Sequence, residues 1–151
     1  MKSLTTHAKT LSIKNSMRLI GRQYRKEVDL IFKRRQVRNP SLKWDKLKPS
    51  TLADKQRKGF GGKRILERTG NLRKGMTRPN HPDNITRIGH NFGSFGTSNK
   101  YGNFHDDIKA SRSKLPLRNF SIPSETTFGV FLRTIEEDIK NQLDLIGIDT
   151  K

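Results

Sequence analysis

Histidines and carboxylates are the residues of this sequence with the clearest potential for acid–base or metal chemistry. No two histidines stand four residues apart, the spacing that places two metal ligands on one face of a helix. His105 precedes Asp106 and Asp107, which suggests a base with an orienting carboxylate, but residues adjacent in sequence rarely face one another. Neither a nucleophile elbow nor a protein-kinase motif is present. We therefore predict that the protein is not an enzyme and holds no metal or cofactor.

A glycine-rich basic run, Gly59-Phe-Gly-Gly-Lys-Arg64, invites comparison with the phosphate-binding loops of nucleotide-binding proteins. It lacks the four-residue spacing before Gly-Lys-Ser/Thr that such loops require, and no apolar strand precedes it. We interpret this run as a basic loop.

Aromatic residues alternate with glycines between Gly89 and Gly102, where Phe92, Phe95 and Tyr101 occur. Such a composition suits stacking on the bases of single-stranded nucleic acid. An RNP-type strand pattern is absent, however, so we prefer a long ordered loop at a subunit contact.

Positive charge is concentrated in the first half of the chain. Residues 1–78 hold 23 Lys and Arg against 5 Asp and Glu, whereas residues 79–151 hold 9 of each kind. The net charge of +18 and the pI near 10.8 indicate an acidic partner such as nucleic acid, an anionic surface or an acidic protein. The alternative is a basic face that contacts only solvent.

Hydrophobic content limits the core that this chain can bury. Only 30% of the 151 residues are hydrophobic, and the mean hydropathy is −0.84, so we expect a small core and some burial against partner subunits. The absence of cysteine excludes disulfides and thiol chemistry. No apolar run has the length of a signal peptide or a membrane span. We expect a soluble protein made in the cytoplasm that does not bind membranes.

A long basic helix is expected from about Ser3 to Gln36, before Asn39-Pro40 ends it. Its apolar residues recur at spacings of three and four, which places them on one buried stripe. They are Ile13, Met17, Ile20, Tyr24, Val28 and Ile31. The cations that we expect to face DNA or acidic partners are Arg18, Arg22, Arg25, Lys26, Lys33, Arg34, Arg35, Lys63 and Arg64.

The middle of the chain is expected to hold a short helix and a hairpin. The helix starts at residues 49–51, with Ser50 or Thr51 as its cap, and ends at residues 58–59. The hairpin spans residues 72–91, with its turn at 79–84 and an extended run that carries Ile85 and Ile88.

A second amphipathic helix is expected from about Ser124, its N-cap, to Ile146, with Gly147 marking its end. Its buried stripe would consist of Phe128, Leu132, Ile135, Ile139 and Ile146. Three acidic residues would then face outward and meet the basic face of a neighbouring copy in a head-to-tail ring. These are Glu136, Glu137 and Asp138.

A series of short motifs runs through the chain from Trp44 onward. They are Trp44, Leu47, Thr51 and Lys55; Leu66-x-x-Thr69-Gly70-x-Leu72; Ile88-Gly89; Tyr101-x-x-x-His105; and Leu115-Pro116-x-Arg118-x-Phe120. In this order they resemble the phage virion morphogenesis family, the tail completion proteins of contractile-tailed and Mu-like phages, and in outline the neck and tail-joining proteins of other tailed phages. The similarity covers residues 44–139. Asp106-Asp107-Ile108 departs from it, because the family usually has Gln and then Gly there.

The resemblance implies an α+β fold with a long N-terminal helix, a small curved antiparallel or mixed sheet, and a C-terminal helix packed on the sheet. It also implies a structural, non-enzymatic ring of six copies at the tail end or the head–tail junction of a virion, assembled in the host cytoplasm. Its partners would be other neck and tail proteins, with DNA passing through the lumen.

Carried over to this sequence, the resemblance makes Thr69-Gly70 the turn between the basic arm and the first strand, with positive φ at Gly70. Tyr101 and His105 would lie on an element lining the sheet, and residues 116–120 on a strand leading into the last helix. The residues that we expect at subunit interfaces are Trp44, Arg118, Glu136, Glu137 and Asp138.

These expectations leave one domain, residues 1–151, and two functions. Within the domain, residues 1–40 form a basic helix or arm, 41–122 a loop-rich sheet region, and 123–147 the C-terminal helix. The first function is a virion structural protein that forms an oligomeric ring. The alternative is a small basic protein that binds nucleic acid through its Lys and Arg side chains.

Overall fold

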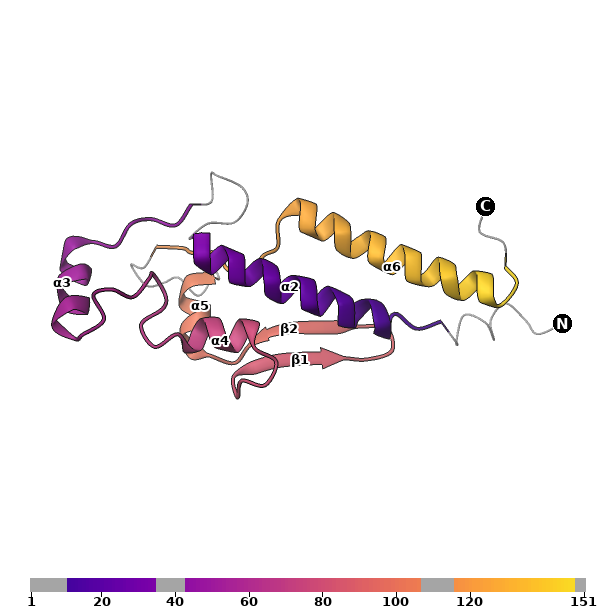
Figure 1. The fold of residues 1–151 in the computed structure, drawn as a ribbon, viewed down its shortest axis with the longest axis horizontal. Helices are drawn as coiled ribbons and strands as arrows, with labels where there is room; N and C mark the ends of the chain where they lie inside the picture. The colour runs from indigo at the N-terminus through magenta and orange to yellow at the C-terminus, as the bar shows by residue number, and fades with distance from the viewer. Residues whose placement is uncertain (1–10, 35–42, 107–115, 149–151) are drawn as a thin grey trace.

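The computed structural model describes residues 11–34, 43–106 and 116–148. Over these residues the fold is α+β, as predicted, with five helices and one two-stranded antiparallel sheet. The elements are α2 (Lys14–Arg34), α3 (Pro49–Arg57), α4 (Asn71–Thr77), β1 (Asn84–Ile88), β2 (Gly93–Thr97), α5 (Lys100–Asp106) and α6 (Glu125–Leu145). The molecule is elongated, with α3 at one end and the C-terminal end of α6 at the other (Figure 1).

Helix α2 is the central element, and its buried stripe is largely the predicted one. The buried members are Met17, Ile20, Tyr24, Val28 and Ile31. The helix begins at Lys14, later than predicted, because residues 11–13 are not helical. Residues 3–10 and 35–36 of the predicted helix lie outside the described residues.

Three aromatic rings close the core at the C-terminal end of α2. The ring of Phe32, which is fully buried, lies with its centroid 5.6 Å from Trp44 and 5.5 Å from Phe120. The Trp44 indole also donates a hydrogen bond of 3.2 Å to the Asn119 carbonyl. This cluster joins α2 to two segments that lie far apart in the sequence.

The hairpin lies later in the chain than the sequence predicted. Residues 72–77, expected in its first strand, belong to helix α4, while β2 occupies part of the segment expected as a loop. Strands β1 and β2 pair in antiparallel register, with Ile85 opposite Gly96. The ring of Phe95 on β2 lies over α2 so closely that a Cβ at Gly21 would be 2.4 Å from it. The absence of a side chain at Gly21 therefore allows Phe95 of the hairpin to pack directly on α2.

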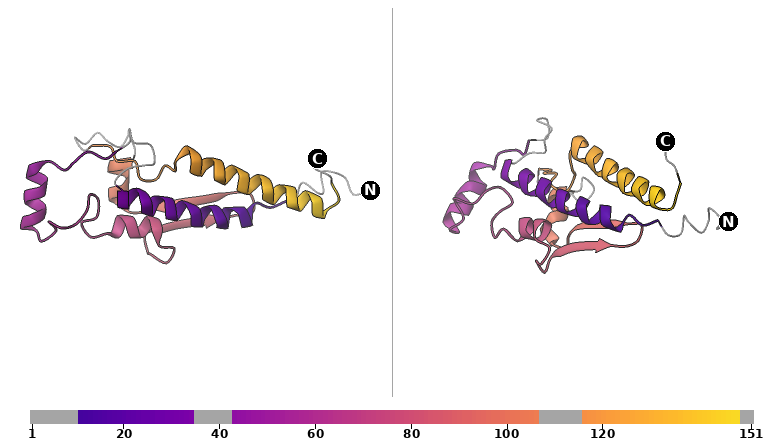
Figure 2. Two further views of the ribbon diagram at one scale, coloured as in Figure 1. Left: turned by 45° about the horizontal axis from the view of Figure 1, so that its top comes forward. Right: turned by 45° about the vertical axis from the view of Figure 1, so that its right-hand side comes forward.

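Helix α6 packs on α2 and runs in the opposite direction, since Ser12 bonds Gln142 while Ser16 bonds Asp138. The C-terminal helix was expected to pack directly on the sheet. In the structure α2 lies between α6 and the hairpin (Figures 1 and 2). The buried residue of α6 is Phe131, which is 8% exposed.

The predicted buried stripe of α6 is largely uncovered. Phe128 and Leu132 are 54% and 47% exposed, and Ile146 is 37% exposed. Ile135 alone among the predicted stripe packs against the core as a partly buried neighbour. The helix thus has more apolar surface than α2 covers.

Residues 45–66, which we call the arm, extend from the rest of the molecule and carry α3 (Figure 2). Helix α3 ends where predicted, but its N-cap is Lys48, which forms no side-chain cap, and Pro49 occupies the first turn instead of a capping hydroxyl. The Lys55 ammonium donates to the carbonyls of Lys63 and Arg64, at 2.6 and 3.1 Å, and so closes the basic loop onto α3.

Candidate binding cavity between the arm and the body

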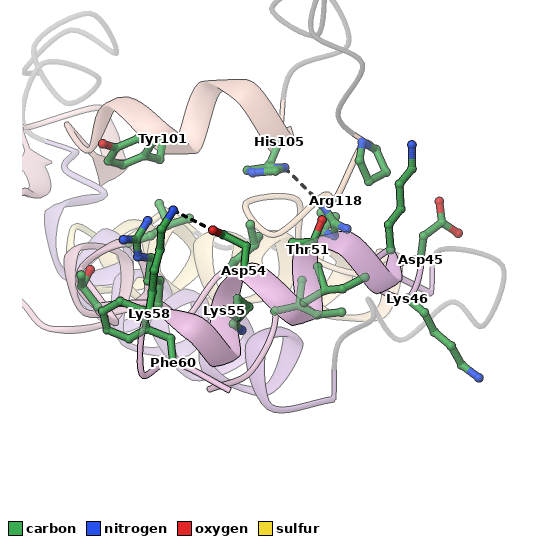
Figure 3. A pocket seen from close by; sticks show the side chains of 18 of the residues that line it. Asp45, Lys46, Thr51, Asp54, Lys55, Lys58, Phe60, Tyr101, His105 and Arg118 are labelled. Carbon is green, nitrogen blue, oxygen red and sulfur yellow. Dashed lines mark hydrogen bonds and ion pairs between the residues drawn. The ribbon is translucent and has the colours of Figure 1, made fainter. Parts of the chain in front are cut away.

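A cavity of about 1010 Å³ lies between the arm and the rest of the chain (Figure 3). Its apolar lining comes from both sides, with Leu47, Phe60 and Leu66 on the arm and Leu72 on α4. Helix α5 contributes Tyr101 and His105, and the extended segment before α6 contributes Pro116 and Arg118. The cavity therefore joins four regions that span more than seventy residues of sequence.

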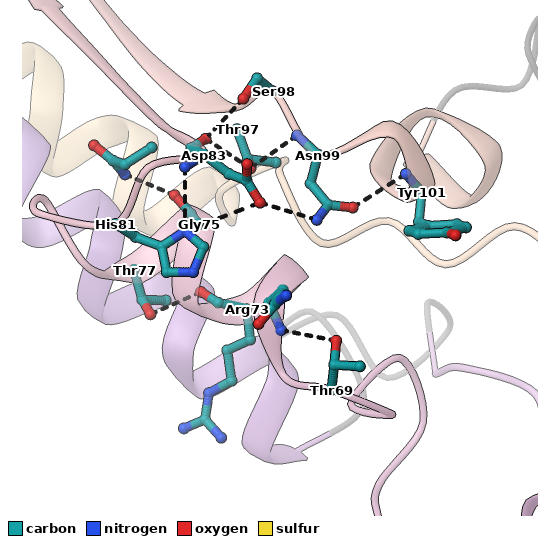
Figure 4. A network of polar contacts seen from close by, with 12 residues as sticks. Thr69, Arg73, Gly75, Thr77, His81, Asp83, Thr97, Ser98, Asn99 and Tyr101 are labelled. Atoms are coloured by element: carbon teal, nitrogen blue, oxygen red, sulfur yellow. Dashed lines mark hydrogen bonds and ion pairs between the residues drawn. The ribbon is translucent and has the colours of Figure 1, made fainter. Parts of the chain in front are cut away.

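A network of polar contacts fixes the start of α5 at this cavity (Figure 4). The side-chain oxygen of Asn99 accepts from the Tyr101 amide at 3.1 Å, and its amide group donates to the Asp83 carboxylate at 3.2 Å. The Asp83 carbonyl in turn accepts from the Thr97 hydroxyl and the Ser98 amide, each at 2.9 Å. The turn before β1 thus positions the Tyr101 side chain, which is 71% exposed.

The end of α5 is tied to the segment before α6. The Asp106 carboxylate accepts from the amides of Phe120 and Ser121, at 2.9 and 3.1 Å. One residue earlier, the His105 carbonyl accepts from the Arg118 amide at 2.6 Å. These backbone contacts place the His105 and Arg118 side chains next to each other. Residues 116–120 were expected on a strand, but they form no strand in the structure.

Arg118 is a buried cation at the cavity that has few hydrogen-bond partners and no ion pair within the described residues. The residue is 4% exposed, its Nε has no hydrogen-bond partner, and one terminal nitrogen lies 3.5 Å from Nδ1 of His105. Burial lowers the pKa of Arg118, and the charge of Asp45 opposes this shift. No carboxylate of the described residues lies within ion-pair distance of the guanidinium.

The surroundings of His105 favour its neutral form. Burial lowers its pKa below the usual 6.5, the positive charge of Arg118 lowers it further, and a hydrogen bond to the Pro116 carbonyl opposes them. Because a guanidinium only donates, a hydrogen bond between the two side chains requires an unprotonated Nδ1 on His105. His105 therefore supplies no negative charge to the Arg118 guanidinium.

The cavity lining is strongly positive. Its cations are Lys46, Lys48, Lys55, Lys58, Arg68 and Arg118, whereas its acidic residues are Asp45 and Asp54. The Asp54 carboxylate is occupied by Lys58 and Arg57, at 2.8 and 2.7 Å, and these hydrogen bonds lower its pKa. An apolar floor with a cationic wall suits a ligand that combines apolar groups with carboxylates.

Four of the five motif groups singled out from the sequence contribute to this cavity, and Ile88-Gly89 does not. Ten residues of those motifs line it: Leu47, Thr51, Lys55, Leu66, Thr69, Leu72, Tyr101, His105, Pro116 and Arg118. Comparison with family models, curated proteins and solved structures finds no match. The cavity is therefore interpreted from its own residues and from the motif order alone.

Thr69-Gly70 forms a turn at the cavity edge, as expected, but it leads into α4 and not into a strand. Gly70 has a φ of 75°, the predicted positive value, and the Thr69 hydroxyl accepts from the Asn71 amide at 3.4 Å. Tyr101 and His105 lie on a helix that the sequence did not predict.

Most cations predicted to face a partner lie on the solvent side of α2 or in the loop after α3. Arg25 differs, since it is partly buried and its pKa is lowered by burial and by the charge of Arg22. The exposed ones are Arg18, Arg22, Lys26, Lys33, Arg34, Lys63 and Arg64. Arg35 lies outside the described residues.

The residues predicted at subunit interfaces divide into two groups. Trp44 and Arg118 are 5% and 4% exposed, so this chain alone already buries them. Asp138 does not face outward as predicted, because its carboxylate contacts Ser16 on α2. Only Glu136 and Glu137 are exposed.

The described residues contain neither a helix suited to span a membrane nor a cluster suited to hold a metal ion. None of the helices in residues 11–34, 43–106 and 116–148 has the length and hydropathy needed to cross a membrane. The same residues contain no group of three or more His, Asp or Glu side chains placed to hold a metal ion.

Sequence reasoning found the cavity residues singly but not as a site. Trp44 packs on Phe32 of α2, and Asn99 before α5 donates to the Asp83 carboxylate, so contacts between distant segments help to build the cavity. The one available signal in the sequence was the set of separate motifs, ten residues of which line the cavity.

Proposed function

We propose that this chain is a structural subunit of a tailed phage particle, acting in a ring at the tail end or at the head–tail junction. The observation that carries the proposal is the gathering of the family-like motifs around one cavity. Residues as distant as Leu47 and Arg118 have no reason to share a cavity if each matched the family by chance. Their meeting supports a resemblance to a whole site.

The surface of the chain supports a role in assembly. Large apolar side chains are exposed on several elements, including Leu52 on α3, Tyr101 and Phe104 on α5, and Phe128 and Leu132 on α6. Exposed apolar groups of this kind mark sites of protein contact. Under this proposal the ring has six copies, neck and tail proteins bind it, and the basic side of α2 faces DNA or acidic neighbours.

Quantitative mass spectrometry of purified, nuclease-treated phage particles from the source tests the proposal. A few copies per particle, close to the stoichiometry of a ring, is the expected result. Absence of the chain from particles would refute it.

Nucleic-acid binding is the second candidate, and one observation favours it. Arg18, Arg22, Lys26 and Lys33 recur at helical spacing on the exposed side of α2, which forms a line of charge suited to phosphates. This function predicts that the isolated chain binds nucleic acid tightly and that the affinity falls steeply with salt. Arg18→Gln and Arg22→Gln would then reduce the salt slope, while Arg133→Gln on α6 would not.

A further inference from the structure

Helix α6 carries an exposed stripe that combines apolar and acidic residues. Glu125, Phe128, Leu132 and Glu136 follow one another at spacings of three, four and four, which places them on one side of the helix. All four are exposed, with Phe128 54% and Leu132 47% accessible. We call these four residues the α6 stripe. It contains no cation.

The cavity beside the arm has the complementary composition. Its floor is apolar, its wall carries six cations, and Arg118 lies in it as a buried guanidinium whose Nε lacks a partner. The charge of Asp45 acts on Arg118, but no carboxylate of the described residues forms an ion pair with it, so an anion that enters the cavity gains from pairing with this buried cation. A carboxylate matches the planar donor arrangement of arginine in a bidentate contact.

We propose that the α6 stripe of one copy of this chain docks into the arm cavity of a second copy. Leu132 and Phe128 contact the apolar floor, and a carboxylate of the stripe, Glu125 or Glu136, pairs with Arg118. This contact rests on the proposed function for its biological setting, as the joint between neighbouring subunits of the ring.

The occupant is a protein segment and not nucleic acid for two reasons. A phosphate backbone follows exposed cations, whereas Arg118 is buried, with 4% of the residue exposed. The apolar floor also has no partner on a phosphodiester chain, but it matches Phe128 and Leu132.

The stripe and the cavity cannot serve each other within one copy. The arm lies at one end of the elongated molecule, while α6 packs along α2 toward the opposite end (Figure 1). Each copy therefore offers a stripe to one neighbour and a cavity to another. Such heterologous contacts generate a closed ring when the rotation between subunits closes, and an open filament when it does not.

Disulfide trapping tests the contact directly, because the chain has no cysteine of its own. One preparation carries Glu136→Cys and the other Thr51→Cys, an exposed residue of the cavity lining. Mixing them under mild oxidation should give a covalent heterodimer. Glu137→Cys is the matched control, because it is exposed on the same helix but turned about 100° away from Glu136. It should give a heterodimer in much lower yield.

Sedimentation analysis of Leu132→Asp provides the second measurement. Loss of the leucine that contacts the apolar floor should weaken self-association by about tenfold or more. Asn141→Asp, at an exposed position about 180° around α6 from Leu132, should leave it unchanged. Equal trapping by both cysteine positions, or unchanged self-association in Leu132→Asp, would overturn the docking proposal.

The two proposals fail separately. If particles contain the chain at ring stoichiometry but trapping is not specific, the ring stands and this contact is wrong. If trapping is specific but the chain is absent from particles, the contact stands and the virion role is wrong.

Discussion

The Asp138 carboxylate on α6 accepts hydrogen bonds from the backbone amide and the hydroxyl of Ser16, in the first turn of α2. Amides in the first turn of a helix have no partner within the helix, and the partial positive charge there favours an anion. Ser16 is 1% exposed, so this contact satisfies polar groups that water does not reach. A residue of one helix therefore caps another helix 122 positions away in sequence.

Removing this cap should destabilise the fold. We expect Asp138→Ala to lower the free energy of unfolding by about 1–3 kcal/mol, because a buried amide and hydroxyl lose a charged acceptor. Urea denaturation followed by circular dichroism measures the change. The neighbouring exposed variant Glu137→Ala should stay within about 0.5 kcal/mol of the wild type. Equal effects of the two variants would contradict the capping role.

The two phenylalanines of α6 should respond very differently to truncation. Phe131 is buried against α2, so Phe131→Ala should cost about 3 kcal/mol of unfolding free energy. Phe128 is 54% exposed, so Phe128→Ala should cost less than about 1 kcal/mol at a protein concentration where the chain is monomeric. Thermal or urea unfolding distinguishes them. A larger loss for Phe128 would mean that the register of α6 on α2 is wrong.

How much of this fold could be predicted depends on whether one face of a helix is apolar or several. On α2, periodicity identified the buried stripe from Ile20 to Ile31 because the other faces of this helix are mainly polar. On α6, Phe128 and Phe131 both fit a helical repeat, and periodicity cannot say which one faces α2. The result was an error of register that also placed Asp138 on the surface.

The cavity was beyond prediction for a different reason. Its residues were noted as separate motifs, and the positive φ of Gly70 was predicted correctly from the turn it forms. That His105 and Arg118 lie side by side depends on the Asp106 carboxylate bonding amides fourteen and fifteen residues away. Contacts of that range leave no periodic signal in a single sequence.

Arg73 should be a second charged residue outside the cavity whose loss destabilises the fold. On α4 it donates to Asp29 of α2 at 2.6 and 2.9 Å and to Glu67 at 2.5 Å. We expect Arg73→Met to cost about 2 kcal/mol, because two partly buried carboxylates lose their donor. Arg78→Met, at an exposed position, is the control and should change unfolding free energy by less than about 0.5 kcal/mol.

The same contact predicts a dependence on acid. Burial alone would raise the pKa of Asp29, but hydrogen bonds from Lys33 and Arg73 outweigh it, and the pKa falls below 3.8. A lowered carboxyl pKa stabilises the fold above the unfolded pKa, and this contribution is lost as pH falls through the folded value. The difference in unfolding free energy between wild type and Arg73→Met should therefore shrink below about pH 4. A constant difference down to pH 3 would argue against the ion pair.

The lowered pKa of His105 predicts a second dependence of stability on pH. It occurs at higher pH than that of Asp29 and involves an imidazole instead of a carboxyl group. Its folded pKa lies below 6.5 because of burial and the charge of Arg118, so the unfolded chain binds the proton more readily. Stability is then fully present above about pH 6.5 and declines as pH falls toward the folded pKa, where the decline ends. Unfolding free energies at pH 7.5 and 5.5 should show this loss in the wild type. The loss should be smaller in His105→Gln, which has no proton to bind, and unchanged in His90→Gln, an exposed position far from the cavity.

Docking of a carboxylate beside Arg118 would place a negative charge near His105, and that charge should raise the pKa of His105. Covalent trapping of the α6 stripe in the cavity is therefore expected to reduce the acid sensitivity of the chain, and an unchanged profile in the trapped dimer would place the stripe elsewhere.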